Sequence, residues 1–168
     1  ADGTYSRRTT VETHSVSMDV QAPSNFERLV FEATDRDADR TRALFETFAR
    51  EGTVTLDDDL LARLRGEVSA ETVSESETRA EIAHAWSAYG QVICPHTAVA
   101  LAAARRQDTA AGPVIALSTA HPAKFPDVVS GALGFEPQRP SVLEGLEGRP
   151  EYCRAVEPTL AAVRASLD

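Results

Sequence analysis

The hydrophobic positions of this chain follow a helical spacing along most of its length. Apolar residues recur three or four positions apart, a repeat that places them on one face of a helix. Polar or glycine-containing stretches separate these segments and supply start and stop signals. The pattern predicts helices over residues 25–33, 39–51, 60–65, 77–89, 95–106, 127–133 and 158–167.

Several short signals indicate where these helices begin and end. Ser24 and Glu27 have the spacing of a capping box, in which each side chain binds the backbone N–H of the other residue. The acidic run 57–59 places negative charge where a helix N-terminus favours it. Glycines follow the helical patterns and predict helix ends at Gly52, Gly66, Gly90 and Gly134.

Two segments are typical of extended structure. Residues 11–20 alternate β-branched with small or polar residues, which predicts an extended segment or strand. Residues 113–119 are apolar on both faces, as in an interior strand of a parallel sheet. Such a strand needs neighbours on both sides, and the rest of the chain scarcely supplies them. We therefore predict a helix-rich α/β fold with few strands.

Composition and charge narrow the class of protein. The 168 residues are 42% hydrophobic and carry a formal net charge of −9. A domain of this length can bury a core without disulfides or metal, and its acidic surface disfavours binding to nucleic acid or to an anionic membrane. No run of about 18 apolar residues predicts a membrane span.

The cysteines indicate the redox compartment of the protein, and the first residues indicate whether its start is natural. Cys94 and Cys153 are far apart and have no metal-site spacing, so two reduced thiols in a cytoplasmic protein are the preferred interpretation, with a disulfide left open. The chain begins at Ala1 without a methionine or an apolar leader. This start predicts either a trimmed protein or a piece of a longer one.

The stretch Ser118-Thr119-Ala120-His121-Pro122-Ala123-Lys124-Phe125 is the richest in candidate chemistry. It follows the apolar run 113–119, and ligands of α/β sheets bind beyond the carboxyl ends of the strands. Lys124 is the only lysine in the chain, so it is a candidate for a Schiff base or a general base. The plainer interpretation, a solvated lysine in a loop, carries more weight.

Other candidates have plainer structural interpretations. Cys94 and His96 could act as nucleophile and base, but no partner that would orient His96 is identifiable, and the stretch is also a good helix start. His14 suits a strand, and His84 a solvated or capping position on a helix. The run 57–59 lacks the spacing of a calcium loop, and no phosphate-binding glycine motif occurs. We predict no metal site.

Three stretches together resemble threonine synthase, in this order and over nearly the whole chain. They are Ser15-Val16-Ser17-Met18-Asp19-Val20-Gln21-Ala22-Pro23-Ser24-Asn25-Phe26-Glu27-Arg28, Cys94-Pro95-His96-Thr97-Ala98-Val99-Ala100 and Leu117-Ser118-Thr119-Ala120-His121-Pro122-Ala123-Lys124-Phe125. The first and third are long and specific. The second is short, and Cys94 stands where members of the family commonly carry an acidic residue.

The resemblance implies a pyridoxal-phosphate (PLP) enzyme of the tryptophan synthase β-like fold, which converts O-phosphohomoserine and water into threonine and phosphate. In that family the Schiff-base lysine and the loop that holds the cofactor phosphate lie in the N-terminal and middle portions. Neither motif occurs in this sequence. The resemblance therefore implies that residues 1–168 are a single C-terminal segment of a larger enzyme, inactive without the missing N-terminal portion as its partner.

The resemblance also assigns cofactor-binding residues. The family counterpart of Thr119 hydrogen-bonds the pyridine nitrogen of PLP, and a hydroxyl there, unlike a carboxylate, does not enforce a protonated ring. Ser118 is a second, weaker candidate. Lys124 belongs to the motif after this ligand and is not the Schiff-base lysine, while His121 and Lys124 are expected either to shape the site or to hold the loop. No catalytic residue is assigned in this chain.

An alternative is a non-catalytic binding or interaction module that has kept this segment of the fold. The intact Ser118-Thr119 pair argues against it, because a segment freed from cofactor contact has no evident need for both hydroxyls. As a fragment with exposed sheet edges, the chain is expected to self-associate.

Overall fold

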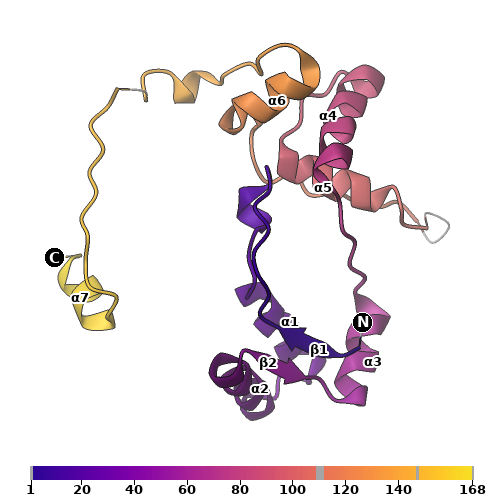
Figure 1. Cartoon of the computed structure of the whole chain (residues 1–168), viewed down its shortest axis with the longest axis vertical. Coiled ribbons are helices and arrows are strands. Elements are labelled where there is room, and N and C mark those ends of the chain that lie inside the picture. Colours follow the sequence, from indigo (N-terminus) through magenta and orange to yellow (C-terminus); the bar gives the residue numbers. More distant parts are fainter. Residues whose placement is uncertain (1, 109–111, 147, 168) are drawn as a thin grey trace. The chain divides into compact units, whose positions relative to one another are not determined.

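The computed structural model describes residues 2–108, 112–146 and 148–167 (Figure 1). The chain divides into one unit that extends to Pro137 and a second that begins at Gln138. The elements of the first unit are β1 (Thr4–Ser6), the 3-10 helix η1 (Val16–Met18), α1 (Ser24–Ala33), α2 (Ala38–Glu51), β2 (Thr53–Thr55), α3 (Asp58–Glu67), α4 (Glu75–Tyr89), α5 (Pro95–Ala104), the 3-10 helix η2 (Pro122–Lys124) and α6 (Pro126–Leu133). The second contains the 3-10 helix η3 (Ser141–Leu143) and α7 (Leu160–Ala165).

Each predicted helix has a counterpart in the structure, with shifted ends. Gly52 and Gly90 follow α2 and α4 in the left-handed conformation, at φ of 72° and 64°, which confirms them as helix ends. The prediction for Gly66 is wrong, because α3 continues through it to Glu67. A glycine inside a helix is tolerated when the packing of its neighbours holds the helix together, and here Leu60 and Leu64 are buried.

The capping box lies at α4 and not at α1. Pro23 is the N-cap of α1, which has no side-chain cap bond, so Ser24 is the first helical residue. At α4 the Ser74 hydroxyl accepts from the Glu77 N–H at 3.3 Å, and the Ser74 N–H donates to the Glu77 carboxylate at 2.8 Å. Both serines precede a glutamate by three residues, so this spacing does not by itself choose between them.

The first half of the unit packs α1, α2 and α3 with a two-stranded antiparallel sheet. Strand β1 pairs with β2 in the register Thr4 to Thr55. The Tyr5 ring lies 4.4 Å from the Phe48 ring and 4.5 Å from the Phe26 ring, centroid to centroid. The apolar core beneath is formed by Val30, Ala33, Leu56, Leu60 and Leu64.

Residues 11–20, predicted as an extended segment or a strand, form no strand. The segment contains η1, and the Asp19 carboxylate accepts from both the N–H and the hydroxyl of Thr13, each at 2.8 Å. These local side-chain bonds satisfy groups that a strand would offer to a neighbour.

Residues 113–119 also form no strand, which corrects the second extended prediction. Ile115 is 81% exposed and Leu117 is 73% exposed. Within the described residues the one sheet is β1 with β2, so this apolar run has no neighbour to pair with.

The second half of the first unit is helical. Helix α4 contacts both α5 and α6, and Ile82, Ala85, Cys94, Ala98 and Val129 are buried there. In the second unit, residues 138–146 and 148–167 include none that is buried. Among the described helices of both units, none has the length and apolar character needed to cross a membrane.

Candidate functional site

The first turn of α5 contains buried polar side chains. Cys94 is the N-cap, and its Sγ accepts from the Thr97 N–H at 3.4 Å. Pro95 follows at the first helical position, where a missing N–H does no harm. Cys94, His96 and Thr97 are all buried. Cys94 therefore acts as a helix cap, and among the described contacts it is not paired with His96 as a nucleophile with its base would be.

The three stretches that carry the family resemblance meet at this turn. The Ser17 N–H, from the first stretch, donates to His96 Nε2 at 3.3 Å. Thr97 Oγ1 and Ser118 Oγ, from the second and third stretches, lie 3.1 Å apart. The His96 ring packs on Phe125 with centroids 4.8 Å apart. Segments far apart in the sequence thus converge on two consecutive residues of α5.

His96 is held neutral in this setting. Burial lowers the pKa of its imidazole, the positive charge of Lys124 lowers the pKa further, and Asp19 opposes this only in part. Because Nε2 accepts from Ser17, the neutral ring carries its proton on Nδ1. That nitrogen is buried and has no hydrogen-bond partner among the described residues.

Ser118 lies at the edge of a cavity of about 330 Å³ between the end of α4 and α5. The lining is mainly apolar and includes Cys94, Thr97 and Leu101. Thr119, the next residue after Ser118, is exposed and lies outside this lining. The structure therefore places the Ser118 hydroxyl in contact with the α5 turn, although both Ser118 and Thr119 are exposed residues.

Lys124 and His121 lie in the loop that follows. His121 Nδ1 accepts from the Ala123 N–H at 3.1 Å and so caps η2. Lys124 ends η2 and is exposed. The geometry gives His121 a structural part in the loop and leaves Lys124 as a solvated lysine.

The remaining histidines and the acidic run have structural partners. The His14 ring contacts the Glu75 carboxylate, which also accepts from the His14 backbone N–H at 3.2 Å. The His84 ring packs edge-on against Tyr89. Asp57 caps α3 by accepting from the Leu60 N–H at 2.9 Å, which confirms the capping interpretation.

Thiols and carboxylates do not form a metal centre in the described part of the chain. Cys94 and Cys153 are both free thiols, the first buried and the second exposed. No group of three histidine, cysteine, aspartate or glutamate side chains gathers there with the geometry to hold a metal ion.

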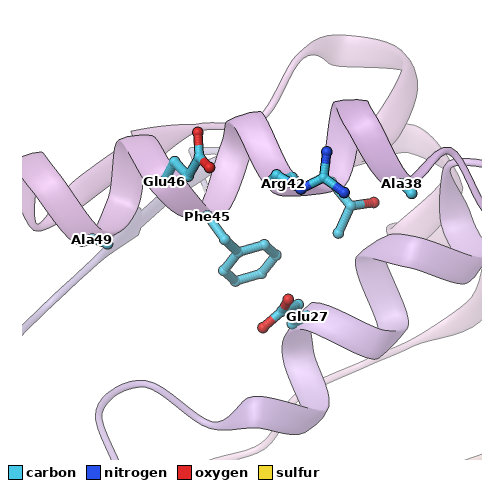
Figure 2. A pocket seen from close by; sticks show the side chains of 7 residues that line it. Glu27, Ala38, Arg42, Phe45, Glu46 and Ala49 are labelled. Atoms are coloured by element: carbon cyan, nitrogen blue, oxygen red, sulfur yellow. The ribbon is translucent and has the colours of Figure 1, made fainter. Parts of the chain in front are cut away.

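Sequence reasoning missed a second hollow, between α1 and α2, of about 440 Å³. Figure 2 shows the Phe45 ring projecting from α2 with Glu27 of α1 beside it, and Arg42 and Glu46 on either side of Phe45 along α2. The Arg42 guanidinium donates to Asp39 at 2.7 Å. These charges do not converge on one point, so the hollow has no evident catalytic arrangement.

Comparison with known proteins gives a consistent set of relatives. Residues 97–167 match the family model for threonine synthase, C-terminal. A threonine synthase of Pseudomonas aeruginosa is 34% identical over 163 residues, which are 96% of this chain and 35% of the relative. The chain thus spans about a third of the length of this relative.

Two solved structures have the same fold. The PLP-bound threonine synthase of Brucella melitensis is 42% identical with a TM-score of 0.78, over 84% of this chain and 30% of that chain. Threonine synthase from yeast is 26% identical with a TM-score of 0.70, over 89% and 31%. These similarities confirm the prediction that the chain has the helix-rich C-terminal segment of the threonine synthase fold. The chain is therefore similar to the C-terminal portion of threonine synthases, which supports the resemblance stated from the three sequence stretches.

Proposed function

We propose that this chain is the C-terminal part of a threonine synthase that converts O-phosphohomoserine and water into threonine and phosphate. The supporting observation is the meeting of the three family motifs at the first turn of α5, through Ser17, His96, Thr97, Ser118 and Phe125. The solved relative from Brucella melitensis binds PLP. We infer that PLP is the cofactor here too.

The cofactor-binding residues in this proposal are Thr119 and Ser118. The Thr119 side chain is exposed at the end of an apolar segment, so its hydroxyl is free to meet the pyridine nitrogen of a cofactor. The Ser118 hydroxyl lies 3.1 Å from the Thr97 hydroxyl of α5. PLP supplies the electron sink of the reaction when bound, and the part of this chain is to orient the ring through neutral hydroxyls.

The Schiff-base lysine of the proposed enzyme comes from outside this chain. Lys124, the only lysine, is exposed at the end of η2 and follows the proposed ring-nitrogen ligand by five residues. We therefore propose that residues 1–168 act together with N-terminal and middle portions of the same enzyme. A cytoplasmic location is part of this proposal.

The native protein, purified from its source with its natural ends, tests the proposal. We expect it to retain PLP through desalting and to release phosphate and threonine from O-phosphohomoserine. A native protein that retains no PLP and releases neither product overturns the proposal and favours the interaction module instead.

The 168-residue chain by itself provides a second measurement. We expect no cofactor absorption band to survive desalting after incubation with PLP, because no Schiff-base lysine is present. A stable band that Lys124→Ala abolishes would show that Lys124 carries the cofactor, contrary to the proposal.

A further inference from the structure

The segment that carries Ser118 and Thr119 has little framework of its own. Residues 113–120 form no helix or strand, and most of them are exposed. Within the described residues, one hydrogen bond ties this segment to the rest of the chain, and it joins Ser118 Oγ to Thr97 Oγ1 at 3.1 Å. Among the described hydrogen bonds, this hydroxyl contact is therefore the one that fixes Ser118, with Thr119 beside it, on α5.

Thr97 is the rigid partner in this contact. It is 6% exposed and lies in the first turn of α5. Its N–H donates to Cys94 Sγ at 3.4 Å, and its hydroxyl lies 3.2 Å from the same sulfur, which is fully buried. A β-branched side chain has few χ1 rotamers, so the Thr97 hydroxyl is held at a fixed place on the helix.

We propose that Thr97 is a positioning residue, which holds Ser118 and thereby directs the Thr119 hydroxyl toward the pyridine nitrogen of the cofactor. Thr97 acts through Ser118 and does not itself contact the cofactor. This inference rests on the proposed function, because it assigns a purpose to the contact within that site.

The expected effect follows from the loss of one hydrogen bond. Thr97→Val keeps the shape of the side chain and removes the hydroxyl. A net hydrogen bond of ordinary strength corresponds to about a five- to tenfold change in an equilibrium constant. We therefore expect the dissociation constant of PLP to rise about five- to tenfold, while Thr97→Ser, which keeps the hydroxyl, stays near the wild-type value.

Thr41 provides a matched control. Thr41 is 5% exposed, and its hydroxyl lies 3.2 Å from the Thr34 hydroxyl. Thr41→Val therefore also removes a buried hydroxyl and its contact with a second hydroxyl. Any cost to folding is shared by the two valine variants. A loss of PLP affinity confined to Thr97→Val indicates positioning and not general destabilisation.

The experiment uses the native protein, with PLP binding followed by cofactor fluorescence and with kcat and KM for O-phosphohomoserine. Wild type that binds PLP, together with a Thr97→Val variant of unchanged affinity, overturns this inference alone. Wild type that binds no PLP overturns the proposed function. Should Thr97→Val not fold, Ser118→Ala removes the other hydroxyl of the pair at an exposed position, and an unchanged PLP affinity in that variant also overturns the inference.

Discussion

Ser74→Ala removes the hydroxyl that begins α4. This hydroxyl accepts from the Glu77 N–H at 3.3 Å and contacts the Glu77 carboxylate at 2.7 Å. Alanine keeps the backbone N–H of residue 74, which donates to that carboxylate at 2.8 Å. The substitution therefore takes away one half of the capping box and leaves the other half in place.

The magnitude follows from the bonds that are lost. Replacing a serine N-cap with alanine costs about 1 kcal/mol, within a range of roughly 0.5–2 kcal/mol. Because the backbone half of the box at Ser74 survives and the bond to the Glu77 N–H is long, we expect a loss of about 1 kcal/mol and not more. For a chain of this length that loss lowers the midpoint of thermal unfolding by about 2–4 °C.

Ser24→Ala is the matched control, since Ser24 has the same spacing to a glutamate but no side-chain cap bond. We expect its effect on the free energy of unfolding to stay below about 0.5 kcal/mol. Urea unfolding followed by circular dichroism measures both variants. A loss at Ser24 that equals or exceeds the loss at Ser74 would refute the assignment of the box to α4.

Three further substitutions test other parts of the molecule. Leu60 is 1% exposed in the core of α1 to α3, so Leu60→Ala is expected to cost about 2–5 kcal/mol in urea unfolding, and a cost below 1 kcal/mol would contradict that core. Burial lowers the pKa of His96 below its usual 6.5 in the folded chain, so near and below that pH the unfolded chain binds more protons than the folded chain. The free energy of unfolding of the wild type should therefore rise with pH from about pH 5 to 7. His96→Gln does not titrate and should flatten this slope in the unfolding free energy measured across that range; an unchanged slope would show that His96 does not cause it. Ile115 is 81% exposed, so Ile115→Ser should reduce the expected self-association of the 168-residue chain in size-exclusion chromatography, whereas identical elution of the two proteins would assign any association to another surface.

Local signals were sufficient for the helices but not for all of their ends. The spacing of apolar residues predicted each helix, because that repeat acts within one turn of the chain. The helix end at Gly52 and the helix cap in the acidic run at Asp57 are predicted correctly because these signals are also local. The ends failed where two local signals compete, as at Ser24, where Pro23 takes the capping position, and at Gly66, where neighbouring leucines are buried.

The extended predictions failed because a strand depends on partners elsewhere in the chain. Residues 113–119 have a strand composition, yet no described strand lies where it would pair with them. Residues 11–20 also alternate like a strand, but Asp19 binds Thr13 and turns the segment. Alternation in sequence indicates what a segment is able to form, and the available neighbours decide whether it does so.

Residue type and local spacing were enough to predict the helical segments, the acidic character and the resemblance to threonine synthase, because each of these depends on short stretches of the chain. The folded chain was needed to show that Ser17 contacts His96 across 79 positions and that Thr97 contacts Ser118 across 21. Contacts at such separations depend on the path of the whole chain, which periodicity does not encode. The motifs indicate the resemblance to threonine synthase, and the fold shows which of their side chains contact one another.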